Sequence, residues 1–218
     1  MRKIQLVLVA LIVLILSAFK ADHVITIYMI GDSTMSNKPL EGNNQERGWG
    51  HVLGSFFTED VRVENHAMNG RSSKSFIDEG RWETVVNKIR PGDYVFIQFG
   101  HNDEKPQPER HTDPGTTFDE NLRKFVRETR AKGGIPVLFN SIVRRNFGVN
   151  PDAVAADDIR PEKDEAVVEG DTLIDTHGKY LESPRNVAKE MDVCFIDLNQ
   201  ATKKLVESYG VEGSKKLF

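Results

Sequence analysis

Short hydrophobic runs that alternate with helical patterns constrain the fold of this 218-residue chain more than any other feature of its sequence. Most of the runs are hydrophobic at consecutive positions, which is the pattern of strands that are buried on both faces. Stretches with helical periodicity separate them, as in parallel sheets whose strands are joined by helices. Five strands are expected, at residues 24–30, 61–65, 94–99, 135–139 and 195–198.

The segments between these strands predict the helices. Thr117 and Glu120 have the spacing of a capping box, which marks the start of one helix, and Asp175 is expected to cap another. The alternation predicts one three-layer, flavodoxin-like α/β domain with about five parallel strands and helices on both faces. The polar stretch 144–171 is too long for an idle connection and is expected to be a lid or a substrate-facing insertion. The expected helices are 49–57, 83–89, 117–132, 175–191 and 201–209.

The N-terminus has the pattern of an export signal. Arg2 and Lys3 precede the apolar run 6–16, and small residues follow it. A positive segment, an apolar stretch of roughly 7–15 residues and small residues behind it are typical of a cleaved signal peptide. A membrane-spanning helix needs about 20 apolar residues. We therefore expect residues 1–21 to be a signal peptide and the mature protein to be periplasmic or secreted, with no stable membrane association after cleavage.

Composition narrows the function classes further. Hydrophobic residues make up 39% of the chain and charged residues 28%, a balance typical of a globular protein. The net charge of −4 gives no electrostatic reason to bind nucleic acid. The single cysteine, Cys194, lies in an apolar run, so we expect it to be a buried core thiol and not a nucleophile.

Residues suited to acyl transfer follow the first three expected strands. Ligands bind beyond the carboxyl ends of the strands in open parallel sheets, so segments 31–34, 69–73 and 100–103 are expected to meet at one rim. Ser33, at a turn preceded by glycine, suits a nucleophile. The backbone N–H groups of Ser33 and Gly70 and the side-chain amide of Asn102 suit an oxyanion hole.

Each motif alone has a simpler interpretation. Serine after a strand is more often a helix cap, and Asn-Gly-Arg-Ser is a turn signal. His101 and Asp103 suggest a metal site, but a second ligand cluster is not evident, and His111 in a Pro-rich loop is expected to be solvated. One motif after each of three successive strands favours an esterase site without a metal.

The combination of these motifs resembles a known family. Gly31-Asp32-Ser33, Gly70 and Gly100-His101-Asn102-Asp103 resemble the first three signature blocks of the SGNH (GDSL-like) hydrolases. With Gly48-Trp49-Gly50 and Arg71-Ser72-Ser73 added, the chain is most similar to the rhamnogalacturonan acetylesterases within that superfamily. The resemblance runs from about residue 25 to the end of the chain and predicts an SGNH hydrolase domain over residues 22–218.

The resemblance also implies a function and a site. It implies that the chain removes acetyl groups from an acetylated pectic, rhamnogalacturonan-type polysaccharide or oligosaccharide, without a metal or organic cofactor. Carried over position by position, Ser33 is the nucleophile and the first oxyanion donor. Gly70 and Asn102 are the other two donors.

The general base of that family is not found in this sequence. It lies in an Asp-x-x-His block near the C-terminus, and this spacing does not occur after Asn102. His177 is a candidate substitute, although Asp175 is expected to cap a helix and the segment precedes the last strand instead of following it. His101 is a weaker candidate. The simplest interpretation is a C-terminally incomplete domain, in which activity is impaired.

Three functions are therefore considered. The first is a serine esterase with an acyl-enzyme on Ser33. The second is a catalytically impaired carbohydrate-binding remnant, or a truncated fragment, of such an esterase. The third is a flavodoxin-like nucleotide or flavin binder, against which the sequence has neither a P-loop nor a Gly-x-Gly-x-x-Gly loop after the first strand.

Overall fold

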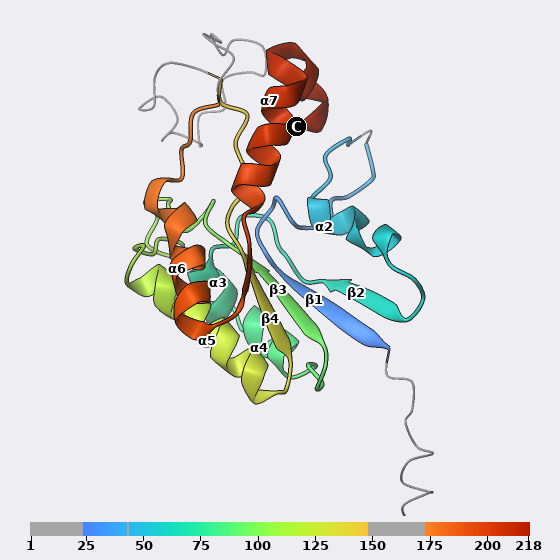
Figure 1. The fold of residues 1–218 in the computed structure, drawn as a ribbon, viewed down its shortest axis with the longest axis vertical. Helices are drawn as coiled ribbons and strands as arrows, with labels where there is room; N and C mark the ends of the chain where they lie inside the picture. Colours follow the sequence, from blue (N-terminus) through green and yellow to red (C-terminus); the bar gives the residue numbers. More distant parts are fainter. Residues whose placement is uncertain (1–23, 43, 148–172) are drawn as a thin grey trace, which may run out of the picture.

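The computed structural model describes residues 24–42, 44–147 and 173–218, and it contains a five-stranded parallel sheet. The order of strands is β2-β1-β3-β4-β5, and every adjacent pair is parallel. The carboxyl ends of all five strands therefore point to one rim, as predicted (Figure 1). The strands are β1 (Ile25–Gly31), β2 (Val61–Asn65), β3 (Tyr94–Gln98), β4 (Ile135–Phe139) and β5 (Cys194–Ile196).

The helices agree with the expected positions, with shifts at their ends and one addition. The region 49–57 forms a short helix followed by a 3₁₀ turn, and a helix at 73–78, where no element was expected, follows the turn at 69–72. The helices are α2 (Trp49–Val52), α3 (Ser73–Asp78), α4 (Arg81–Val86), α5 (Thr117–Ala131), α6 (Glu182–Met191) and α7 (Leu198–Gly213). The 3₁₀ turns are η1 (Leu53–Phe56), η3 (Gly178–Leu181) and η4 (Ser214–Leu217).

Neither helix cap lies at the residue expected. The capping box at Thr117 is wrong: Thr117 lies inside α5, and its hydroxyl accepts a hydrogen bond from the N–H of Asp113 at 2.7 Å. The N-cap residues of η3 and α6 are His177 and Leu181, not Asp175, whose carboxylate accepts from the N–H groups of His177 and Gly178 at 3.1 and 3.0 Å. These bonds hold the turn that leads into η3 and α6.

One face of the sheet packs against four helices. α3, α4, α5 and α6 cover it, and the main hydrophobic core lies between them and β1, β3 and β4. Phe125 of α5 is at the centre of this core, with its ring 5.0 Å from Trp82 and 5.5 Å from Phe99, centroid to centroid. All three side chains are at most 2% exposed. This face contributes most of the apolar area that drives folding.

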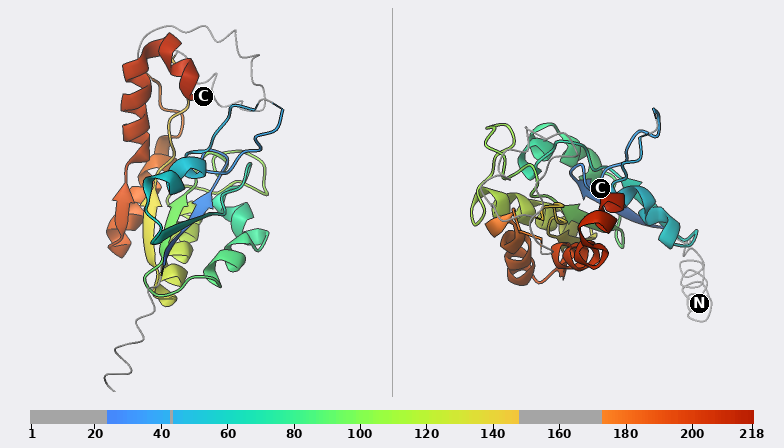
Figure 2. Two further views of the ribbon diagram at one scale, coloured as in Figure 1. Left: turned by 90° about the vertical axis from the view of Figure 1, so that its right-hand side faces the viewer. Right: turned by 90° about the horizontal axis from the view of Figure 1, so that it is seen from above.

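The opposite face carries a smaller core. α2 and η1 pack over β1 and β2, where Ile27, Met29 and Met35 are buried. Figure 2 shows α2 on the other side of the sheet from α3 and α4. Towards β5 the described elements leave this face open, because Ile135 and Ile196 are 41% and 42% exposed.

The expectation that Cys194 is a buried core thiol is wrong. Cys194 is exposed, and the strand that contains it, β5, is the edge of the sheet and has exposed residues at alternate positions. Only Phe195 of this strand packs against the main core. Continuous hydrophobicity in the sequence does not distinguish an edge strand from a central one.

α7 rises from the end of β5 and extends beyond the rim (Figure 1). Its buried residue Val206 packs with Val143, Phe147 and Leu173 in a third hydrophobic cluster. Phe147 and Leu173 form an antiparallel bridge, so the chain segments before and after residues 148–172 lie side by side here. The expected signal peptide (1–21) and most of the expected insertion (144–171) lie outside the described residues. No helix among the described residues is long and apolar enough to cross a bilayer.

We predict that the Phe125→Ala variant loses about 3–5 kcal/mol of unfolding free energy, because a fully buried aromatic side chain leaves a cavity when truncated. Urea denaturation followed by tryptophan fluorescence measures this loss. Phe56→Ala is the matched control, because Phe56 is 79% exposed and should change the free energy by less than about 0.5 kcal/mol. Equal losses in the two variants would contradict the location of the core.

Candidate active site

The expected nucleophile, Ser33, lies at the carboxyl end of β1 and is partly exposed. The backbone turns tightly there, since the N–H groups of Met35 and Ser36 donate to the carbonyl of Asp32 at 3.3 and 3.1 Å. Gly31 is needed at this point, because a side chain would collide with the carbonyl of Gln98 on β3. The turn therefore places Ser33 at the rim, where it is partly exposed.

A chain of hydrogen bonds fixes this turn from below. The Trp49 indole N–H donates to Gln98 Oε1 at 2.5 Å, and Gln98 Nε2 donates to Thr34 Oγ1 at 2.7 Å. The Thr34 hydroxyl and N–H then donate to Asp32 Oδ1 at 2.8 and 2.9 Å. Asp32 is fully buried, and desolvation raises the pKa of its carboxyl group. The dipoles of this chain all point towards one buried carboxylate next to Ser33.

Gly70, the second expected oxyanion donor, lies in the turn after β2. Its φ is +74°, a left-handed conformation that glycine adopts at little cost. The Ser36 hydroxyl donates to Asn69 Oδ1 at 2.6 Å and also contacts the Ser33 carbonyl at 3.3 Å. The structure thus joins the Gly70 turn directly to the Ser33 turn.

Asn102, the third expected donor, lies on the turn after β3. Its side chain is nearly buried, and its amide Nδ2 donates to the carbonyl of Arg71 at 3.2 Å. Arg71 immediately follows Gly70, so this bond joins the second and third segments of the rim. The structure therefore brings the segments of Ser33, Gly70 and Asn102 together as the sequence predicts.

Asp103 is the residue that holds these two segments in register, and sequence reasoning gave it no such role. Its buried carboxylate accepts from the N–H and the hydroxyl of Ser73 at 3.0 and 2.5 Å. It also accepts from the Thr112 hydroxyl at 3.0 Å and from the Gly100 N–H at 3.1 Å. Burial raises the pKa of Asp103 to about 7. The acidic side chain of the Gly-His-Asn-Asp motif is the only sequence signal for this position.

His177, the candidate base, is buried behind the rim with its side chain 1% exposed. Its Nε2 lies 3.1 Å from the carbonyl oxygen of Ile142. Its Nδ1 lies 3.1 Å from Glu104 Oε2 and 3.1 Å from Arg144 Nη1. Both ring nitrogens are thus engaged by groups other than Ser33.

The other described histidines also have other neighbours. The ring of His101 lies 4.4 Å from that of His177, centroid to centroid, and burial holds the pKa of His101 well below its usual value. His51, His66 and His111 contact Lys38, Glu64 and Asp113, respectively. Within the described part of the chain, the Ser33 hydroxyl forms no hydrogen bond with a histidine ring.

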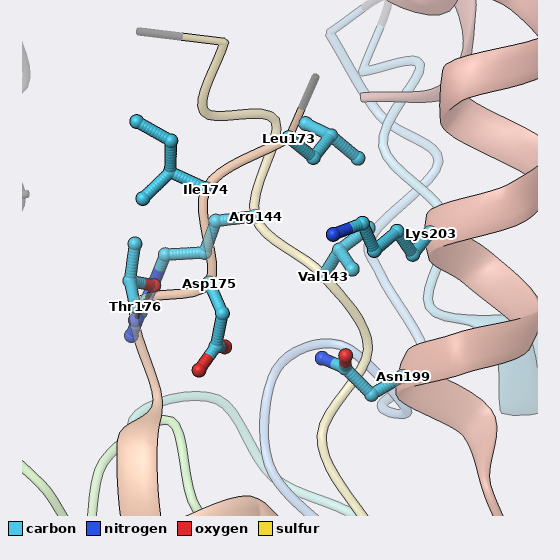
Figure 3. Close-up of a pocket in the computed structure, with 8 residues that line it drawn as sticks. All are labelled: Val143, Arg144, Leu173, Ile174, Asp175, Thr176, Asn199 and Lys203. Carbon is cyan, nitrogen blue, oxygen red and sulfur yellow. Dashed lines mark hydrogen bonds between the residues drawn. The ribbon is translucent and has the colours of Figure 1, made fainter. Parts of the chain in front are cut away.

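A metal centre is not evident among residues 24–42, 44–147 and 173–218. No group of three or more His, Cys, Asp or Glu side chains is arranged there to hold an ion. A pocket between α7 and the segments before and after residues 148–172 is shown in Figure 3, with Lys203 and Asn199 on one side and Asp175 on the other. Its volume of about 10 Å³ is room for about one water molecule. This pocket is therefore too small for a saccharide.

We predict that His101 makes stability fall in acid. His101 stays neutral in the folded protein, whereas the unfolded chain takes up a proton below its ordinary pKa of 6.5. The unfolded state then binds more protons, so the unfolding free energy falls as the pH drops through 6.5, by at most about 1.4 kcal/mol per pH unit. His101→Gln should lose less stability than the wild type between about pH 7 and about pH 5 in urea titrations.

The control for this experiment is His111→Gln. The side chain of His111 is 39% exposed, and this variant should keep the wild-type pH dependence. The raised pKa of Asp103 acts in the opposite direction, because the folded protein holds that proton more tightly than the unfolded chain. This opposing effect is common to all three proteins and cancels in the comparison. If the unfolding free energies of His101→Gln and the wild type depended on pH in the same way, His101 would be excluded as the cause of the loss of stability in acid.

Comparisons with known proteins agree with this geometry. The model of the GDSL-like Lipase/Acylhydrolase family matches residues 29–210. Rhamnogalacturonan acetylesterase RhgT of Bacillus subtilis (strain 168) is 40% identical over 194 residues, which are 89% of this chain and 73% of RhgT. The probable rhamnogalacturonan acetylesterase YesY of the same organism is 40% identical over 128 residues, 58% of this chain and 57% of YesY.

The fold has a counterpart among solved structures. The crystal structure of protein YxiM from Bacillus subtilis matches with a TM-score of 0.71 and 26% sequence identity, over 89% of this chain and 49% of the YxiM chain. This chain thus spans about half of the length of that structure. With the five-stranded parallel sheet and the three rim segments in place, the chain belongs to the GDSL-like lipase/acylhydrolase family of carboxylic ester hydrolases.

Proposed function

We propose that this protein is a serine esterase that removes acetyl groups from a pectic, rhamnogalacturonan-type polysaccharide through an acyl-enzyme on Ser33. The observation that carries the proposal is the convergence of Ser33, Gly70 and Asn102 at one rim, joined by the Asn102–Arg71 and Ser36–Asn69 hydrogen bonds. The substrate class is supported by the 40% identity to RhgT, a rhamnogalacturonan acetylesterase. We also propose that the protein is exported, on the strength of the N-terminal sequence pattern.

The reaction has two steps. In the first, Ser33 Oγ attacks the acetyl carbonyl, the bond from that carbon to the sugar oxygen breaks, and the Ser33 proton passes to the departing sugar oxygen, which leaves as a hydroxyl. In the second, water attacks the acetyl group on Ser33, the bond from that carbon to Ser33 Oγ breaks, and one proton of the water passes to Ser33 Oγ while the acetic acid that leaves ionises to acetate and a proton. Each step passes through a tetrahedral oxyanion, which the Ser33 N–H, the Gly70 N–H and the Asn102 amide would stabilise.

The geometry of Asn102 suits this role. Its Nδ2 carries two hydrogens, and the bond to the Arg71 carbonyl uses one of them. The second is available to a substrate oxygen. The Arg71 bond also holds the amide still before substrate binds, which is the preorganisation that makes an oxyanion hole effective.

A base must carry the proton between Ser33 and the sugar oxygen, and His177 remains the candidate. To act, one of its ring nitrogens would have to leave the Ile142 carbonyl or the Glu104 carboxylate. This cost favours a second candidate function, a carbohydrate-binding domain of the same family with little turnover. The specific observation in its favour is that, among the described residues, no histidine ring is hydrogen-bonded to Ser33.

We predict that replacing Ser33 abolishes acetate release from acetylated rhamnogalacturonan. Asn102→Ala should lower kcat by about 10²–10³, because it removes one oxyanion donor. Acetate release is measured with purified variants. Asn87→Ala is a suitable control, because Asn87 is exposed at the end of α4 and is not one of the proposed donors. Acetate release by Ser33→Ala equal to the wild type would contradict the proposal.

A separate measurement distinguishes the two candidate functions. If His177 is the base, His177→Ala should lower kcat by several orders of magnitude, because a serine without a base is a poor nucleophile. A wild-type protein that binds the polysaccharide in calorimetry but releases acetate no faster than Ser33→Ala is the result expected of the carbohydrate-binding alternative. Robust turnover that survives His177→Ala would exclude His177 as the base.

A further inference from the structure

The turn that carries Asn102 is tied to a buried cluster formed by Glu104, Arg144 and His177. Glu104 and Arg144 form an ion pair with side chains only 16% and 15% exposed, and His177 is 1% exposed. The three residues come from segments far apart in the sequence: the turn after β3, the chain after β4 and the approach to η3. Charge-assisted bonds in such a poorly solvated place are strong and directional.

Arg144 is the centre of this cluster. Its Nη2 donates to Glu104 and lies 3.5 Å from the carbonyl of His101, while its Nη1 donates to Thr176 Oγ1 at 2.8 Å. One planar guanidinium therefore contacts the 101–104 turn and the 176–177 segment at once. An ammonium group could not reproduce this fork.

Asn102 is constrained from both sides by the same cluster. On one side, the ring of His101 lies 4.4 Å from that of His177. On the other, the carboxylate of Glu104, two residues further on, binds Arg144 and His177. The cluster thus acts together with the Asp103 bonds to hold the turn in which the Asn102 amide donates to the Arg71 carbonyl at 3.2 Å.

We propose that Glu104, acting through Arg144 and His177, is a positioning residue for the Asn102 amide. The cluster couples that amide to the paired segments 142–147 and 173–177, which are joined by the Phe147–Leu173 bridge. An oxyanion donor loses its effect when it is displaced by a fraction of an ångström, so this coupling sets the competence of the site. The role of Asn102 as a donor rests on the proposed function, but its positioning can be measured without turnover.

The test follows the side-chain amide of Asn102 by ¹H–¹⁵N NMR in the full chain. Its signal is assigned by its loss in Asn102→Asp, and its exchange with water is measured by magnetisation transfer. Glu104→Gln keeps the shape of the side chain but removes its charge, and we expect at least a tenfold faster exchange of the Asn102 amide. Arg144→Lys keeps the charge but removes the fork, and the same change is expected there.

Two controls separate positioning from general loosening. Glu190→Gln removes the charge of a glutamate that also pairs with an arginine, Arg123, in an ion pair between α5 and α6. The side chain of Glu190 is 54% exposed. It should leave the Asn102 amide unchanged. The Asn65 amide, bonded to the Met35 carbonyl at 2.8 Å, should exchange at the same rate in every variant.

The outcomes decide the proposal. Folded Glu104→Gln and Arg144→Lys proteins in which Asn102 exchanges as in the wild type would overturn it. So would equal acceleration at Asn102 and Asn65, or the loss of a folded state in both variants, because each result assigns the cluster to stability alone. A wild-type protein without esterase activity would count against the proposed function and leave the exchange result intact.

Discussion

The rim depends on one buried carboxylate, that of Asp103. A carboxylate removed from water is costly unless donors surround it, and here Ser73, Thr112 and Gly100 supply four of them. Ser73 is the first residue of α3, Gly100 lies in the turn after β3, and Thr112 lies in the loop before α5. Satisfying Asp103 therefore forces three separate pieces of backbone into one arrangement, and the positions of Gly70 and Asn102 follow from it.

The nucleophile turn is fixed by the same principle on the other side of the site. Asp32 is buried beneath Ser33, and the donors reach it in one direction, from Trp49 through Gln98 and Thr34. Gln98 ends β3 and Trp49 begins α2, so the turn after β1 is fixed by both the neighbouring strand and the smaller core. Two buried acids thus organise the rim from opposite sides. Asp32 directly precedes Ser33, and Asp103 directly follows Asn102.

Local sequence was sufficient to predict the strands and the segments that meet at the rim. It was insufficient for features that depend on tertiary contacts. The strands at 61–65 and 135–139 were predicted to the residue, because both patterns are local: the first alternates valine with a charged residue, and the second is a largely buried hydrophobic run. The helix α3 was missed because Asn69 to Ser72 also match a turn; Ser72 in fact caps α3 with Ser75 in the role that Glu or Gln usually takes. The exposure of Cys194 could not be predicted, because it depends on which strand forms the edge of the sheet.

The proposed nucleophile and oxyanion donors could be predicted from the sequence, but the residues that hold them in place could not. Ser33, Gly70 and Asn102 each follow a strand, so the rule for parallel sheets brings them together without knowledge of any contact. Glu104, Arg144 and His177 are separated by tens of residues and share no motif, so only the folded chain reveals that they meet. A charged residue directly beside a motif, as Glu104 is beside Asp103, is the weak signal that could have drawn attention to the cluster.

The segment after β4 explains how α7 is connected to this rim. The backbone turns tightly at Arg145, because the N–H of Asn146 donates to the carbonyl of Arg144 at 2.8 Å, and the two adjacent arginines contact different parts of the protein. Arg144 turns to Glu104 and the Asn102 turn, whereas Arg145 donates to the Ser214 hydroxyl at 3.0 Å and to the Val211 carbonyl at 2.5 Å. Val211 follows Gly210, whose φ of +66° kinks the last part of α7. Two neighbouring guanidinium groups thus link the far end of the last helix and the oxyanion turn to the same stretch of backbone, so a displacement of that stretch would disturb both.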